Sequence, residues 1–139
     1  MSHIERIGVS IPKELLARFD EFIEEQGYSN RSEAIRDLIR ARLVEEEWKA
    51  GQEESFAAVT LVYSHEQLDL ASKLTDIQHE HYKRIVSTMH IHIDPHRCLE
   101  VVILRGKGKA IKQLAERLIS LKGILHGKAV YTTTGKKIA

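Results

Sequence analysis

The chain has 139 residues and a net charge of +1, and its 42% hydrophobic and 29% charged residues are typical of a soluble globular protein rather than a disordered one. No apolar run approaches the ~18 residues of a membrane span, and the first dozen residues lack the apolar block of a signal peptide. The length suits one ordinary domain or two very small ones. The single cysteine excludes an internal disulfide, so we expect a cytoplasmic protein.

The N-terminal part of the sequence predicts one strand and two helices. Apolar and polar residues alternate over residues 6–12, as in a half-buried strand. Apolar residues at helical spacing follow over residues 13–27, whose final glycine ends the helix. The second helix begins at Asn30, which can cap it together with Glu33 three residues later. Because a lone strand has no partner in so small a unit, we expect it to pair with the same strand of a second chain, in an intertwined dimer.

A polar stretch with one glycine, residues 49–54, is interpreted as a linker between a domain of residues 1–48 and a domain of residues 55–139. The second domain predicts the order strand, helix, strand, strand, helix, strand, which is the ferredoxin-like βαββαβ pattern. The predicted ranges are 55–64, 66–81, 84–93, 98–106, 109–123 and 126–134. The last helix is the clearest, with an apolar stripe of Ile111, Leu114, Ala115 and Leu118. The expected fold class is α+β.

Two histidines lie two residues apart on the strand predicted over residues 84–93. Strand alternation places Ile85 and Met89 on one face, and it places His90 and His92 side by side on the other. Two imidazoles at that spacing can bind one metal ion.

The only cysteine follows this strand after a turn-rich stretch. A connection of five residues would place Cys98 opposite His92 and Glu100 opposite His90. A connection of four residues would place Cys98 opposite Ile93, on the wrong face. A metal site therefore requires one particular hairpin register.

Two imidazoles and one thiolate supply only three ligands. The fourth ligand is either water, as in a catalytic zinc centre, or another histidine such as His79 or His81. Tetragonal geometry suits Ni(II) or Cu(II) and tetrahedral geometry suits Zn(II), and these alternatives stay open at the level of spacing. Without a metal, these would be ordinary strand histidines and a small buried cysteine.

A ribbon made from one strand of each of two chains fits the major groove of DNA. Its outward residues would be Arg6, Gly8 and Ser10, of which Arg6 has donors that can read guanine.

The start of the second helix is suited to hold a DNA phosphate through Asn30, Arg31 and Ser32. The alternative is that Asn30 and Ser32 only cap the helix and that Arg31 is a solvated charge. Residues 1–50 carry 8 Lys and Arg against 11 Asp and Glu, a net charge of −3, which does not support DNA binding by itself.

The segments "RIGVSIPKELL" and "GYSNRSEAIRDLIR" resemble a ribbon-helix-helix repressor domain. The segments "QHEH" and "HIHIDPHRCLE", within the βαββαβ order, resemble the C-terminal domain of the NikR family of nickel-responsive regulators. The resemblance covers nearly the whole chain, and the combination is more specific than either half.

This resemblance implies a homotetramer, a dimer of dimers with ACT-like domains at the centre and DNA-binding dimers on either side. It implies one four-coordinate, square-planar Ni(II) per subunit at the central interface. Matched position by position, the ligands are His90, His92 and Cys98 of one subunit and His79 of another.

The same resemblance implies that Glu100 and Tyr63 orient the ligands. It implies a second cation site between the domains, often filled by K+, for which Glu33 and Asp37 would supply carboxylates. The alternative for that pair is a solvated acidic face. Gly8 departs from the family pattern, which commonly has a polar residue at the middle reading position.

We therefore expect a nickel-dependent transcriptional regulator that binds a double-stranded DNA operator and represses nickel uptake genes when Ni(II) is bound. We expect neither an enzyme nor a small organic substrate or membrane partner. Two alternatives remain: an enzyme with a His/His/Cys zinc centre and Glu100 as general base, or a DNA-binding regulator whose ACT-like domain senses an amino acid.

Overall fold

The computed structural model describes residues 3–139, except for the side chain of Leu68. The chain divides into two compact units. The smaller unit contains the described residues up to Glu45 together with Gly135–Ala139, and the larger unit contains Glu46–Thr134. Among the described residues, none of the helices combines the length and the apolar character needed to cross a membrane.

The smaller unit contains an extended N-terminal segment and two helices, α1 (Lys13–Glu25) and α2 (Arg31–Ala50), the last turn of which belongs to the larger unit. The segment predicted as a strand, residues 6–12, is not a strand in the single chain. Its apolar side chains are exposed, with Ile7 at 78% and Val9 at 69%. A strand needs a hydrogen-bonded partner, and the described residues of one copy supply none.

The predicted cap of the second helix is confirmed. Asn30 Oδ1 accepts a hydrogen bond from the backbone N–H of Glu33 at 2.9 Å, which satisfies one of the free N–H groups at the helix start. The Glu33 carboxylate in turn accepts a bond from the Ser29 hydroxyl at 3.4 Å. Gly27, with φ of 84°, follows the end of α1 in the left-handed conformation that the sequence predicts there.

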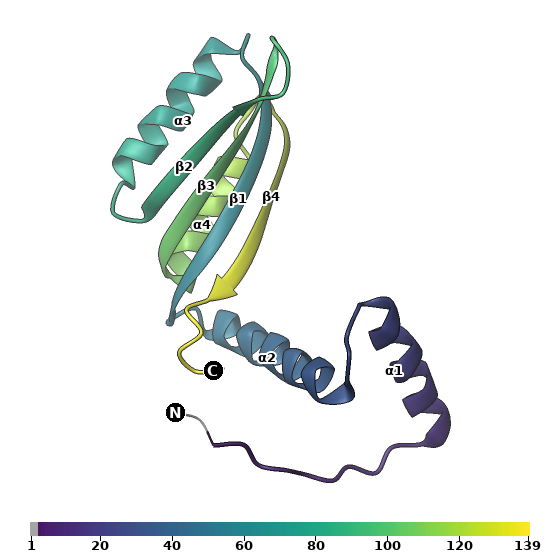
Figure 1. Ribbon diagram of the computed structural model, residues 1–139. Helices are drawn as coiled ribbons and strands as arrows, with labels where there is room; N and C mark the ends of the chain where they lie inside the picture. Colours follow the sequence, from purple (N-terminus) through teal and green to yellow (C-terminus); the bar gives the residue numbers. More distant parts are fainter. Residues whose placement is uncertain (1–2) are drawn as a thin grey trace. The chain divides into compact units, whose positions relative to one another are not determined.

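The larger unit has the predicted βαββαβ order (Figure 1). Its elements are β1 (Glu54–Ser64), α3 (Leu68–Glu80), β2 (Ile85–His92), β3 (Arg97–Lys107), α4 (Gly108–Ile119) and β4 (Ile124–Thr133). The strands form one antiparallel sheet in the order β2-β3-β1-β4, so that β2 and β4 are its edges. This is the arrangement expected for a ferredoxin-like α+β domain.

One hydrophobic core lies between the sheet and its two helices. Alternate residues of β1 and β3 point into it, as the alternating burial of both strands shows. The helix α3 contributes Leu70, Leu74 and Ile77. The predicted stripe of α4 is confirmed, because Ile111, Leu114, Ala115 and Leu118 are all buried.

An irregularity at the start of β2 changes one predicted face. The register shifts by one residue between Ile85 and Ser87, so that Ile85 pairs with Leu104 and packs against the core. The expectation that Ile85 and Met89 share a face is therefore wrong, because strict alternation does not survive a bulge.

The segment predicted as a linker, residues 49–54, is mostly ordered within neighbouring elements. Its first two residues belong to α2 and Glu54 begins β1. The last turn of α2 is anchored by Trp48, whose Nε1–H donates to the Thr132 carbonyl at 3.0 Å and whose ring centre lies 4.8 Å from that of Tyr131. A Cβ at Gly108 would come within 3.2 Å of the indole, so glycine permits this close approach.

We expect Trp48→Ala to lower the free energy of unfolding of the larger unit by about 2 to 3 kcal/mol, because it removes a half-buried ring from the edge of the core. Trp48→Phe keeps most of that packing and loses the hydrogen bond to Thr132, so it is expected to cost about 1 kcal/mol. Urea unfolding followed by circular dichroism measures both. Equal losses for the two variants would contradict the packing argument.

Candidate metal centre

The hairpin of β2 and β3 has the register that a metal site requires. His92 pairs with Cys98 and His90 pairs with Glu100, so the five-residue connection is confirmed. The face of β3 that carries Cys98 and Glu100 is buried against the helices. Because β2 is the sheet edge, His90 and His92 stay accessible beside these buried groups.

A third imidazole joins the pair from the end of β1. The ligand nitrogens of His65, His90 and His92 all lie within 4.8 Å of one another, and His65 Nε2 is 3.0 Å from His92 Nδ1. The rings of His65 and His92 stack with their centres 4.9 Å apart. No sequence pattern points to His65, because it follows β1 and the sheet places β3 between β1 and β2. The turn after β1 carries its ring to His92.

Cys98 lies on the same face but is not one of these grouped donors. Its side chain is fully buried, and its thiol lies 3.7 Å from the Tyr63 carbonyl oxygen, to which it donates. Burial raises the pKa of the Cys98 thiol, so the group carries its proton at neutral pH. Ligation to a metal would require the thiol to lose that proton and leave the carbonyl.

Glu100 lies at the centre of a buried hydrogen-bond network. Its Oε1 accepts a bond from the Tyr63 hydroxyl at 3.4 Å and lies 3.6 Å from His90 Nδ1. Its Oε2 accepts a bond from Gln78 Nε2 on α3 at 3.0 Å. Burial raises the pKa of the Tyr63 hydroxyl, which therefore remains a donor. The network links α3 to a histidine of β2, and no sequence pattern selects Gln78.

His79 stands apart from the three grouped rings. It is exposed near the end of α3 and lines an open cavity of about 310 Å³ with residues of β2, among them Ser87 and Thr88. His81 instead has its Nε2 3.3 Å from the Arg117 guanidinium.

The donor set fits a transition metal. Imidazole nitrogens and a thiol suit Ni(II), Cu(II) and Zn(II), whereas Mg²⁺ and Ca²⁺ prefer oxygen ligands. The structure groups the two imidazoles of the edge strand with His65, and it pairs His92 across the ladder with Cys98. These residues could hold such an ion if the Cys98 thiol leaves the Tyr63 carbonyl.

The predicted DNA-contacting residues lie at two places in the smaller unit. Arg6, Gly8 and Ser10 are exposed along the extended N-terminal segment. Arg31 forms a two-point ion pair with Asp20, at 2.8 Å for both contacts, which raises the pKa of the guanidinium. Ser32 and the capping residue Asn30 are exposed beside it.

The two carboxylates predicted for a second cation are already engaged. Asp37 accepts a hydrogen bond from the Tyr28 hydroxyl at 2.6 Å and lies 3.6 Å from the Arg40 guanidinium. Glu33 accepts the Ser29 bond described above. A cation at Asp37 would therefore have to share that carboxylate with Arg40.

Comparison with known families divides the chain in the same order. Residues 5–46 match the ribbon-helix-helix proteins of the CopG family. Residues 56–132 match the family described as the NikR C-terminal nickel-binding domain. A solved structure of an uncharacterised Thermotoga maritima protein has a TM-score of 0.51 at 16% identity, over 57% of this chain and 98% of that one, which shows a shared fold alone.

Similar proteins extend over nearly the full length. A Pyrococcus furiosus protein is 56% identical over 135 residues, which are 97% of this chain and 98% of that protein. A Geotalea uraniireducens protein is 54% identical over 138 residues, 99% of each chain. Both are assigned by name to the nickel-responsive regulators. The present chain belongs to this family and joins a ribbon-helix-helix domain to a NikR C-terminal domain.

Proposed function

We infer that this protein is a nickel-responsive, DNA-binding transcriptional regulator. The observation that carries this inference is the pairing of His92 with Cys98 on a sheet edge, in a chain that begins with a ribbon-helix-helix domain. The family consists of transcriptional regulators rather than enzymes, which sets the zinc-enzyme alternative aside. Glu100, the base in that alternative, is buried and already hydrogen-bonded by Tyr63 and Gln78.

The proposed ligands are His90, His92 and Cys98 of one subunit and His79 of another, with one Ni(II) per subunit. His79 is exposed and lines an open cavity, so a second copy can reach it. His65 is the alternative fourth ligand, since its ring already contacts His92 within one chain. Bound Ni(II) would supply a coordinate link between two subunits.

The chain's own residues could carry the effect of this link into α3. Glu100 holds His90 on one side and Gln78 on the other, and Gln78 is next to His79 in the sequence. When His79 is fixed by a second subunit, α3 and β2 become tied at two adjacent points. Such a regulator works as a switch only if one arrangement of the DNA-binding domains is favoured over the others.

Exposed apolar surfaces in both units support assembly of several copies. In the smaller unit they surround a cavity of about 310 Å³ between α1 and α2. Phe22 and Leu38 line this cavity and are exposed, and Leu15, Ile39 and Leu43 are further exposed apolar residues of the same two helices. In the larger unit, the sheet face away from the helices exposes Met89, Ile91, Ile93 and Val130. Contiguous apolar surface of this kind marks interfaces, and two different interfaces per chain would generate a homotetramer.

The DNA operator would be read by the paired N-terminal segments of two chains. Arg6 and Ser10 are the base-reading candidates, while Gly8 has no side chain to contribute. Asn30, Arg31 and Ser32 would hold a phosphate at the start of α2, where Arg31 must exchange Asp20 for DNA.

The physiological setting follows from these assignments as a further proposal. A regulator of this kind would act in the cytoplasm and repress nickel uptake genes when Ni(II) is plentiful. A second cation such as K+ would use Glu33 and Asp37, in competition with Arg40 for the Asp37 carboxylate.

Operator binding with and without nickel tests the function. An operator can be selected from random duplex DNA in the presence of Ni(II), and binding can then be measured for the wild type, Cys98→Ala and His79→Ala. Both variants are expected to keep their fold and lose nickel-dependent binding. His81→Ala, at the end of the same helix, is the matched control and should bind as the wild type does. Nickel-dependent binding by Cys98→Ala would refute the ligand assignment.

Mixing the two defective variants tests whether the site is shared between subunits. In a mixed assembly, a His79→Ala subunit supplies His90, His92 and Cys98, and a Cys98→Ala subunit supplies His79. Some sites then have all four proposed ligands. We expect the nickel–thiolate absorption to reappear in the mixture and to be absent from each variant alone. If the fourth ligand is instead His65 of the same chain, His79→Ala alone already shows the nickel–thiolate absorption, and mixing adds nothing. In that case His65→Ala loses the absorption.

Nickel affinity should rise with pH. The pKa of Cys98 is raised, so at neutral pH the thiol is protonated in the metal-free protein and must release its proton on binding. The apparent association constant is therefore expected to increase about tenfold per pH unit near neutrality. Competition against a chelator of known affinity measures this slope. A flat profile would show that the thiolate is not a ligand.

A further inference from the structure

The connection between the two ligand-bearing strands is closed by a specific backbone pair. The N–H groups of Ile93 and Asp94 both donate to the Arg97 carbonyl, at 3.0 and 3.3 Å. Closure at residues 93 and 97 makes His92 and Cys98 the next pair along the ladder. The register of the metal centre is therefore set at this turn.

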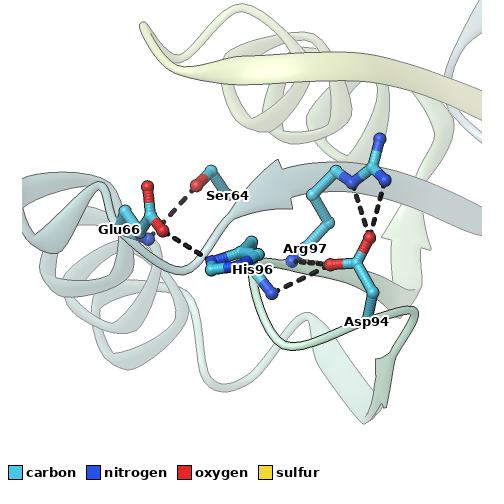
Figure 2. Close-up of polar contacts among 5 residues, drawn as sticks. All are labelled: Ser64, Glu66, Asp94, His96 and Arg97. Atoms are coloured by element: carbon cyan, nitrogen blue, oxygen red, sulfur yellow. Dashed lines mark hydrogen bonds and ion pairs between the residues drawn. The ribbon is translucent and has the colours of Figure 1, made fainter.

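One carboxylate accepts four hydrogen bonds inside the turn, as Figure 2 shows. Asp94 Oδ1 accepts the backbone N–H groups of His96 and Arg97 at 2.8 and 2.7 Å. Asp94 Oδ2 accepts Nε and Nη2 of Arg97 at 2.9 and 2.6 Å. Together these bonds lower the pKa of Asp94 to about 2, so the carboxylate stays charged. Aspartate is suited to this geometry because its short side chain reaches the backbone two residues ahead.

The turn is also attached to the corner that carries the third imidazole. The His96 carbonyl accepts the backbone N–H of His65 at 2.8 Å. The His96 ring places Nδ1 2.6 Å from Glu66 Oε1, while the Glu66 backbone N–H donates to the Ser64 hydroxyl (Figure 2). The position of His65 against His92 therefore depends on where the turn holds His96.

The far end of β2 shows why this attachment matters. The pairing of β2 with β3 already shifts by one residue between Ile85 and Ser87, and among the described strands β2 is an edge with β3 as its one neighbour. A further one-residue slip would move His90 and His92 to the opposite face from Cys98. The turn lies at the other end of this edge strand, and the Asp94 carboxylate accepts the hydrogen bonds within the turn.

We propose that Asp94 is a positioning residue for the metal centre: its carboxylate holds His92 opposite Cys98 and, through His96, holds the His65 corner against His92. The proposal rests on the proposed function for its nickel readout, but its effect on Cys98 can be measured without metal.

Three substitutions at Asp94 distinguish the effect of its bonds to the turn backbone from the effect of its ion pair with Arg97. Asp94→Ala removes all four bonds. Asp94→Glu keeps the charge for Arg97, but its longer side chain does not fit the bonds to the turn backbone. Asp94→Asn keeps a carbonyl oxygen for both backbone N–H groups. The matched control is Glu54→Ala, which removes a 2.6 Å ion pair with Arg105 at the other end of β3.

The first readout is the rate at which a thiol reagent modifies Cys98 in the metal-free full-length protein. Cys98 is fully buried, so modification reports opening of the hairpin. Asp94→Ala and Asp94→Glu are expected to react about tenfold faster than the wild type, since each loses bonds between backbone and a charged group. Asp94→Asn should recover most of the protection, and Glu54→Ala should react as the wild type does.

The second readout is nickel titration followed through the nickel–thiolate absorption. Asp94→Ala and Asp94→Glu are expected to bind nickel about tenfold more weakly, and Asp94→Asn should bind nearly as the wild type does. If Asp94→Ala does not fold, Asp94→Glu and Asp94→Asn still give the comparison. The proposal is overturned if both disruptive variants keep the wild-type rate, if Glu54→Ala accelerates equally, or if Asp94→Asn fails to protect. If the wild type itself shows no nickel–thiolate absorption, the proposed function fails while the modification rates still decide the role of Asp94.

Discussion

The antiparallel pairing of β2 with β3 is the interaction on which the metal centre depends. It joins an accessible edge strand to a strand whose inner face is buried, so each histidine of β2 has a buried polar partner across the ladder. His92 faces Cys98 and His90 faces Glu100. A slip of one residue would place the imidazoles and the thiol on opposite faces of the sheet.

This placement gives the centre both access and control. The imidazoles can meet an ion from solution, whereas Cys98 lies in the core and has a raised pKa. Glu100 is buried with three polar neighbours, an arrangement that is stable because every partner is hydrogen-bonded or close to a charge. Through Gln78 this carboxylate connects the ligand strand with α3, which carries His79. A change at the centre can therefore reach a helix without passing through a flexible loop.

Both units of the single chain expose surfaces that a second copy could cover. The N-terminal segment is extended and has no strand partner within residues 3–139, and apolar residues of α1 and α2 surround an open cavity. The outer face of the sheet is apolar as well. Water-exposed surface of this kind is stabilised by burial against another copy, at roughly 25 cal/mol per Å². The proposed shared ligand and the predicted DNA ribbon would each be completed by a second copy, and at different surfaces.

Of the two hairpin registers considered from the sequence, the structure decided which one is present. The sequence by itself determined the βαββαβ order of the larger unit, the α4 stripe and the Asn30 cap, because each follows from local periodicity or from a short spacing. It also pointed to the family, since the motifs of both domains lie in contiguous segments. Only the tertiary structure decided the rest. The bulge at Ile85 breaks the alternation from which its face was predicted, and His65 and Gln78 reach the centre from elements distant in sequence. The stretch "STMHIHIDPHRCLE" shows which donors are present. Packing decides that a third imidazole joins them and that the Cys98 thiol is hydrogen-bonded to the Tyr63 carbonyl.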